Sequence, residues 1–169
     1  MSRQVVYDGR VVKLGLEDAT LPDGRRVRLE IIRHQGAAAV LPLHEDGTVT
    51  LIQQYRHAAG GLIWEVPAGV IEPGEQPDVC AARELAEEAR LRAAELRPLA
   101  VIHTTPGFTD ERIYLYLATG LSETDGQLDA DEYLHARRLP LSEALAMSAD
   151  GRITDAKTLV TLLLAARSA

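Results

Sequence analysis

The sequence predicts an α/β (α+β) sandwich with a mixed sheet, preceded by a small N-terminal antiparallel sheet. Three observations support this prediction. Short runs of alternating apolar residues, separated by turns with glycine or proline, dominate the first half of the chain. One segment of helical apolar spacing follows at 77–90, and more strand-like runs and two late helical segments complete the chain. The length of 169 residues suits one domain with a sizeable core.

The N-terminal strands are expected within residues 5–34, with a DG turn at 8–9 and a PDG turn at 22–24. These turns come early, and the hydrophobic density rises only after Gly36. We therefore expect residues 1–35 to form a β subdomain of their own and residues 36–169 to form the main domain.

The next segments alternate between strands and one helix. Residues 37–43 and 48–56 are expected to be strands joined by an HEDG turn, and a short strand at 63–69 should be stopped by its proline and its last glycine. Proline suits the first turn of a helix, so a helix should begin at Pro77 and run to about Arg90.

The last part of the sequence, from residue 96, predicts two strands, a loop and two helices. Residues 96–104 and 112–120 are strand-like, and residues 122–132 are polar and acidic, as expected of a loop. Residues 141–151 should form a short amphipathic helix, and residues 154–169 a closing helix capped by its first threonine or aspartate.

The overall charge limits the possible partners. A net charge of −7 argues against a nucleic-acid or anionic-membrane surface, and an anionic substrate would need local compensation, most simply by a divalent cation. The single cysteine, Cys80, cannot form an internal disulfide and is expected to be a small helix-packing residue in a reducing compartment. The first residues lack the apolar run of a signal peptide, so we expect a soluble cytoplasmic protein.

The predicted helix at 77–90 places three glutamates side by side, Glu84, Glu87 and Glu88. Like charges at this spacing destabilise a helix by roughly 0.2–0.5 kcal/mol per pair. One interpretation is a solvated helix face. Against it, Arg83 is the only cation within the cluster, so charge pairing should be poor. A hard divalent cation such as Mg²⁺ prefers oxygen ligands and would remove the repulsion.

The spacing around these glutamates resembles the Nudix box, G-x5-E-x7-R-E-U-x-E-E-x-G-U, where U is apolar. Gly69, Glu75 and the run at 83–91 fit every specified position except one. Arg90 stands where the family usually has glycine, which puts the loop geometry at the helix end in question. The resemblance implies a Nudix-type sandwich fold, and it implies that Arg83 and Glu75 hold the box in shape by ion pairing.

The family resemblance also implies the chemistry, the hydrolysis of a nucleoside diphosphate linked to another group with Mg²⁺ or Mn²⁺ as cofactor. Glu84 and Glu88 would be the principal metal ligands. Glu87 would be a further ligand or a partner of a metal-bound water, and the backbone carbonyl of Ala68 would join the coordination. A solvated acidic face remains the alternative for these side chains.

The flanking sequence resembles the ADP-ribose pyrophosphatase branch, through 54–56, 60–69 and 105–111. This implies ADP-ribose as substrate, cleaved to AMP and ribose 5-phosphate; GDP-mannose and other sugar-nucleotide hydrolases share much of these motifs. The implied substrate-binding residues are Arg56, Pro106, Gly107, Phe108 and Glu111. Their plain alternatives are a sheet-edge charge for the arginine, a turn for the proline and glycine, and a solvated strand residue for the glutamate.

The acidic loop at 122–132 offers a general base, because a carboxylate bound to Mg²⁺ has little basicity left. The resemblance implies that an acidic residue of this loop activates the water or completes the metal site. Glu132 is the first candidate and Asp131 the second, with Glu87 or Glu111 next, and a solvated acidic loop is the alternative. The branch also implies a homodimer in which residues 1–35 pack across a two-fold axis.

Two further classes of function fit the sequence less well. A non-catalytic Nudix-like sensor of nucleotide sugars usually has a degraded box or an added DNA-binding domain, and a structural metal-binding helix would not need the segment at 105–111. The chain has no G-x-x-x-x-G-K-[ST] phosphate loop and no G-x-S-x-G nucleophile elbow. An enzyme with a small-molecule nucleotide-sugar substrate is therefore the prediction.

Overall fold

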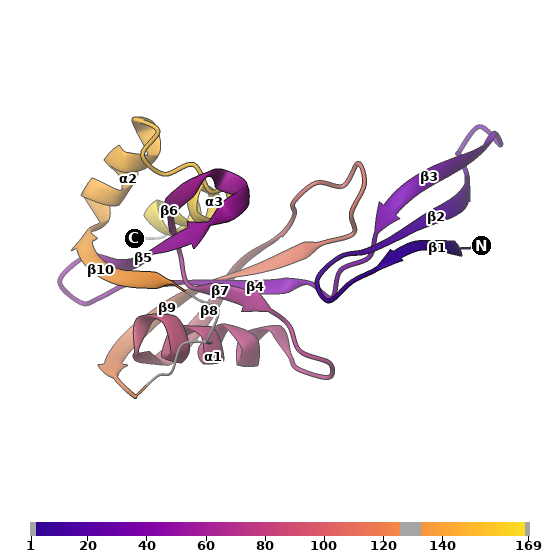
Figure 1. The fold of residues 1–169 in the computed structure, drawn as a ribbon. Coiled ribbons are helices and arrows are strands. Elements are labelled where there is room, and N and C mark those ends of the chain that lie inside the picture. The colour runs from indigo at the N-terminus through magenta and orange to yellow at the C-terminus, as the bar shows by residue number, and fades with distance from the viewer. Residues whose placement is uncertain (1–2, 126–132, 168–169) are drawn as a thin grey trace.

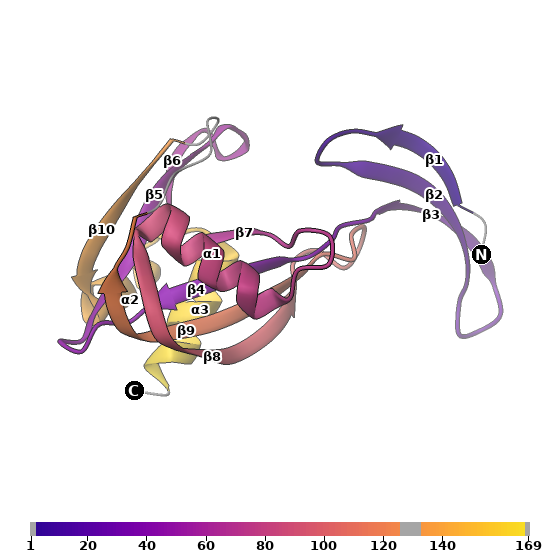
Figure 2. The ribbon, with the colours of Figure 1, turned by 90° about the horizontal axis from the view of Figure 1, so that it is seen from below.

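The N-terminal strands form a sheet that projects from the rest of the molecule. The computed structural model describes residues 3–125 and 133–167. The strands β1 (Arg3–Asp8), β2 (Lys13–Thr20) and β3 (Arg26–Ile32) pair antiparallel in the order β1-β2-β3. Figures 1 and 2 show this sheet as an arm beside the main body. The antiparallel N-terminal sheet predicted from the sequence is thus present.

The main body holds two further sheets. The larger has the order β7-β4-β9-β8, in which β4 and β9 are parallel and the other pairs antiparallel. The smaller has the order β10-β5-β6 and is antiparallel. Their strands are β4 (Ala37–Pro42), β5 (Thr48–Arg56), β6 (Gly61–Glu65), β7 (Ala68–Val70), β8 (Leu91–His103), β9 (Arg112–Glu123) and β10 (Leu134–Pro140), with a short 3-10 turn at His57–Ala59.

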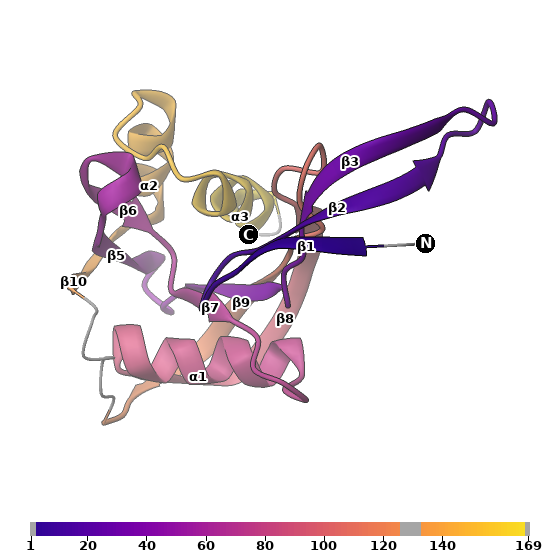
Figure 3. The same cartoon turned by 45° about the vertical axis from the view of Figure 1, so that its right-hand side comes forward.

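Helix α1 (Pro77–Ala89) covers one side of the larger sheet, and α2 (Leu141–Ala149) and α3 (Ala156–Ala166) lie on the other (Figure 3). Successive side chains of a strand point to opposite faces, and β4 is buried on both. Ala38 and Val40 belong to the core cluster that holds α1, whereas Leu41 belongs to the cluster that holds α3. The mixed-sheet α/β sandwich is therefore confirmed.

Most predicted elements are present, and the differences are local. β7 includes Gly69, which we expected to end a strand rather than lie within one. β10 is a strand that the sequence did not predict, and it follows the acidic segment that was predicted to be a loop. The cap of α3 is Asp155, whose side chain accepts a hydrogen bond from the Thr158 N–H. No helix in the described part of the chain is long and apolar enough to cross a membrane.

The residue that follows α1 explains why the box pattern has glycine there. Arg90 has φ 54° and ψ 41°, the left-handed conformation, and its N–H closes the helix on the Ala86 carbonyl at 3.2 Å. It is the one non-glycine residue with positive φ in the described ranges. This conformation costs a residue with a Cβ about 1–2 kcal/mol. The helix end therefore keeps its geometry at a local energetic cost.

We predict that Arg90→Gly stabilises the protein by about 0.5–1 kcal/mol, because glycine removes the left-handed strain but loses more backbone entropy on folding. The free energy of unfolding from urea denaturation measures this. Ala82→Gly is the control, and it should destabilise the protein by about 0.5–1 kcal/mol because Ala82 is exposed and lies in the middle of the helix. A less stable Arg90→Gly protein would contradict the strain argument.

Candidate active site

Two of the three helix carboxylates are buried against the short strand β7. Glu84 and Glu88 are only 8% and 3% exposed. Glu88 accepts a hydrogen bond from the Ala68 N–H at 2.8 Å, which joins α1 to β7. Glu87, three residues after Glu84 on the helix, is partly exposed. A merely solvated helix face is therefore wrong for Glu84 and Glu88.

Gly69 allows the close approach of Glu84. A Cβ placed on Gly69 would lie 1.7 Å from Glu84 Oε1 and 2.2 Å from its carboxyl carbon. Any side chain here would displace the carboxylate from its position beside the strand. The Cys80 thiol, which is buried, donates to the Gly69 carbonyl at 3.5 Å and packs α1 on the same strand. The glycine that begins the box is thus required by a contact within the box.

Arg83 balances more of the negative charge than we expected from the sequence. Its Nη1 contacts Glu84 Oε1 at 2.6 Å and Glu87 Oε2 at 3.1 Å, and its Nε contacts Glu75 Oε1 at 3.0 Å. Its Nη2 also donates to the Val70 carbonyl. The hydrogen bond from Arg83 lowers the pKa of Glu75 to about 2. The expectation of poor charge pairing was therefore wrong, and the predicted Arg83–Glu75 ion pair is present.

The oxygen atoms gathered here have the chemistry of a magnesium site. Carboxylates and backbone carbonyls are the ligands that Mg²⁺ and Mn²⁺ use. Glu84, Glu87, Glu88 and the Ala68 carbonyl could supply them. Within the described ranges no three such side chains already converge on one point. The Arg83 guanidinium now balances the charge of Glu84 and Glu87. A metal ion bound to these two carboxylates would have to replace their bonds to Arg83.

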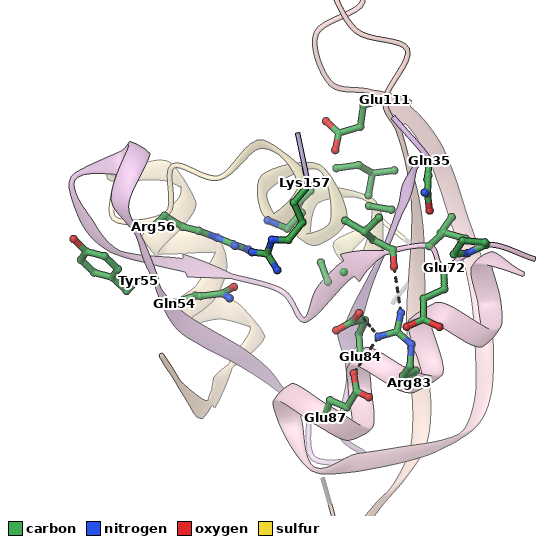
Figure 4. Close-up of a pocket in the computed structure, with 18 of the residues that line it drawn as sticks. Gln35, Gln54, Tyr55, Arg56, Glu72, Arg83, Glu84, Glu87, Glu111 and Lys157 are labelled. Atoms are coloured by element: carbon green, nitrogen blue, oxygen red, sulfur yellow. Dashed lines mark hydrogen bonds and ion pairs between the residues drawn. The ribbon is translucent and has the colours of Figure 1, made fainter. Parts of the chain in front are cut away.

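Cations form the opposite side of the pocket (Figure 4). Arg56, at the end of β5, donates from Nε and Nη2 to both oxygens of Glu65 at 2.8 and 2.9 Å. Lys157, in the first turn of α3, donates to Glu65 Oε2, the oxygen that also accepts from Arg56 Nη2, and its Nζ lies 3.0 Å from Asp155 Oδ1. Hydrogen bonding to Glu65 raises the pKa of Arg56, so the guanidinium stays charged.

These two sides enclose a pocket of about 620 Å³ between α1, β5, β7 and α3. Of the residues predicted for the site, it is lined by Arg56, Ala68, Glu84, Glu87 and Glu111. Other residues at its wall include Arg10, Gln35, Gln54, Tyr55, Gly69, Glu72, Arg83, Tyr133 and Lys157. The structure therefore brings residues from eight separate parts of the sequence to one cavity.

The segment between β8 and β9 contributes one side chain to the pocket. Glu111 accepts from the Thr104 hydroxyl at 2.7 Å and lies 3.7 Å from His34 Nε2. Pro106, Gly107 and Phe108 do not line the pocket. The Phe108 ring is exposed, and its backbone carbonyl accepts from an N–H of β3.

The candidate bases Asp131 and Glu132 lie outside the described residues. Sequence reasoning missed Glu65 and Lys157. The composition offered one signal for Lys157: only two of the 18 basic residues are lysines, and the others are arginines.

We predict that Gly69→Ala lowers the free energy of unfolding by about 1–3 kcal/mol, because its Cβ overlaps the buried Glu84 carboxylate. Gly61→Ala is the matched control, since a Cβ there meets nothing within 4 Å. The control should change stability by no more than about 0.5 kcal/mol. Urea denaturation of both variants measures the difference, and equal stabilities would show that Glu84 has room to move.

Comparison with known proteins agrees with this geometry. The family model for the NUDIX domain matches residues 33–162. A methanol dehydrogenase activator of Bacillus methanolicus is 41% identical over 93% of this chain and 86% of its own. An ADP-ribose pyrophosphatase of Bacillus subtilis (strain 168) is 36% identical over 94% and 86%. A crystal structure of an ADP compounds hydrolase has a TM-score of 0.85 at 24% identity, covering 99% of this chain and 91% of that one, which supports the fold. The chain belongs to the Nudix family.

Proposed function

We propose that the protein hydrolyses the pyrophosphate bond of a nucleoside diphosphate sugar, with ADP-ribose cleaved to AMP and ribose 5-phosphate as the preferred reaction. The observation that supports this most directly is the two-sided pocket. Carboxylates that can hold a cation line one side, and Arg56 and Lys157 line the other. A pyrophosphate carries several negative charges, and this arrangement offers compensation from both directions.

The cofactor in this proposal is Mg²⁺ or Mn²⁺. Glu84 and Glu88 would be its principal ligands, with Glu87 and the Ala68 carbonyl completing the protein's share. A bound divalent cation neutralises charge on the pyrophosphate and polarises its phosphoryl oxygens. Arg83 keeps Glu75 and the box loop in place through bonds that do not involve the proposed ligands.

We predict that Glu84→Gln and Glu88→Gln each lower kcat by roughly 100-fold with a much smaller effect on KM, since even a group that only orients a metal ligand is worth 10–100-fold. Initial rates with ADP-ribose at several Mg²⁺ and Mn²⁺ concentrations measure this. Glu95→Gln, at an exposed position of β8, controls for loss of one carboxylate. Near-wild-type turnover in both box variants would contradict the proposal that Glu84 and Glu88 hold a catalytic metal.

The substrate is tested by a screen that resolves products. ADP-ribose, GDP-mannose and UDP-sugars are incubated with each metal, and the products are separated by chromatography. ADP-ribose is expected to give the highest kcat/KM. The sequence relatives include ADP-ribose pyrophosphatases and GDP-mannose pyrophosphatases. A preference for GDP-mannose would change the substrate within the same chemistry, and no turnover of any compound would favour a nucleotide-sugar sensor.

The proposed general base is Glu132, with Asp131 as the second candidate. A base outside the metal ligands keeps its basicity, and Glu132→Gln is expected to cut kcat by roughly 10²–10⁴-fold while leaving substrate affinity nearly unchanged. Pre-steady-state rates and substrate titration separate the two quantities. If Glu132→Gln and Asp131→Asn both react normally, Glu87 and Glu111, which line the pocket, are the next residues to test.

We further propose that the protein is a homodimer through the N-terminal sheet, residues 1–35. β1 is exposed along its whole length, and the sheet and its first turn expose the large apolar residues Val5, Val6, Tyr7, Val11, Val12 and Leu29. An isolated three-stranded sheet with such a surface gains stability from a partner. The single buried cysteine suits the reducing cytoplasm, which is the proposed compartment.

We predict a dimer by light scattering, and a monomer for the double variant Val5→Asp/Tyr7→Asp. Two buried charges in an apolar interface have no partners and oppose association. Val101→Asp, at a similarly exposed position on β8, should leave the dimer intact. A wild-type protein that is monomeric and fully active would contradict the proposal.

A further inference from the structure

We propose that Lys157 completes a phosphate-binding subsite beside Arg56, which is already expected to contact the substrate, and that the buried carboxylate of Glu65 positions both cations. The subsite would hold the phosphoryl group of the diphosphate that lies away from the α1 carboxylates. Its place in catalysis rests on the proposed function, but its ligand chemistry, an anionic phosphate, does not. Glu65 is a positioning residue in this proposal, because it acts through the two cations.

The bonds of Lys157 to described residues leave one of its N–H donors for a ligand. An ammonium group has three N–H donors. Among the described residues the ammonium bonds Glu65 and Asp155, which account for two of them. The side chain is 12% exposed and lines the pocket. A nearly buried lysine at the wall of a pocket, with a donor remaining, is suited to an anionic ligand.

Arg56 also keeps donors for a ligand. A guanidinium has five N–H donors, and Glu65 takes one from Nε and one from Nη2. The remaining donors belong to a side chain that is 42% exposed and lines the same pocket as Lys157. Figure 4 shows the Arg56 and Lys157 side chains beside one another, across the cavity from Glu84 and Glu87.

Glu65 joins the two cations. Its side chain is 1% exposed, and its two oxygens together receive Arg56 and Lys157. Burial raises the pKa of the Glu65 carboxyl, but hydrogen bonds and charge from Arg56 and Lys157 outweigh burial and hold the pKa below its ordinary value. Glu65 is therefore ionised at neutral pH, and it fixes both cations at the pocket wall.

Buried hydrogen bonds join the two elements that carry the subsite. The Thr158 hydroxyl accepts from the Val66 N–H at 2.9 Å and donates to Asp155 at 2.6 Å. These bonds join the residue after Glu65 to the first turn of α3, next to Lys157. Val66 and Thr158 are fully buried. Two elements about ninety residues apart in sequence, β6 and α3, thus present Glu65 and Lys157 at a fixed separation.

The direct test measures binding of inorganic pyrophosphate by calorimetry with EDTA present, so that neither metal nor hydrolysis contributes. Wild-type protein should bind, and Lys157→Met should raise Kd by about tenfold or more, the order expected for a lost charge-assisted hydrogen bond. Arg92→Met, which removes an exposed positive charge on β8, should leave Kd unchanged. Absence of wild-type binding, or equal Kd values for wild type and Lys157→Met, would overturn the subsite.

The role of Glu65 is tested by the sign of its effect. Removing a negative charge beside two cations should tighten pyrophosphate binding if Glu65 contributes only charge. A positioning role predicts the opposite, weaker binding for Glu65→Gln and also for Glu65→Asp, which keeps the charge and shortens the reach. Circular dichroism checks that both variants are folded, and tighter binding by Glu65→Gln would refute positioning. If Glu65→Gln fails to fold, Glu65→Asp alone decides.

The outcomes also separate this inference from the proposed function. A wild-type protein that binds pyrophosphate through Lys157 but hydrolyses no sugar nucleotide would keep the subsite and reject the enzyme. A protein that hydrolyses ADP-ribose, while Lys157→Met has wild-type kcat, KM and pyrophosphate affinity, would keep the enzyme and reject the subsite.

Discussion

The contact between α1 and the three-residue strand β7 is the constraint on which the site depends. The Ala68 N–H binds Glu88, and the missing Cβ of Gly69 lets Glu84 lie against the strand. β7 itself is held by antiparallel pairing with β4, which is parallel to β9 in the centre of the larger sheet. The position of the carboxylates therefore follows from the sheet, and a shift of β7 would move the proposed metal ligands and the pocket wall together.

The two sides of the pocket carry opposite charge, and each side balances its charge in a different way. On α1, two carboxylates, Glu84 and Glu87, share one arginine, Arg83, whose bonds also reach Glu75. On the opposite side, one buried carboxylate, Glu65, is shared by two cations. The first arrangement leaves negative charge that suits the proposed metal, and the second presents positive charge to an anion. A chain with a net charge of −7 can in this way offer a local site for a negatively charged substrate.

The sequence predicted those features that depend on local pattern, and the missed ones depend on tertiary contacts. Helix α1 was predicted within about one residue at its end, because proline, apolar spacing and the box pattern agree. β7 has three residues, too few for alternation to appear, and β10 is mostly exposed and polar, as is common for an edge strand. Lys157 was missed because nothing near it in sequence shows that α3 begins beside Glu65. The pairs of Arg83 with Glu84 and Glu87 are local to the helix and could have been predicted from spacing, as its ion pair with Glu75 was predicted from the box pattern.

Arg83 connects the stability of the box to its proposed chemistry. Its Nε and Nη2 hold Glu75 and the Val70 carbonyl, whereas only Nη1 contacts Glu84 and Glu87. A divalent cation that takes Glu84 and Glu87 would therefore displace one nitrogen of the guanidinium and leave the others in place. The loop from β7 to α1 would stay closed during this exchange. A lysine could not do this, because a single ammonium offers one nitrogen for all of these contacts.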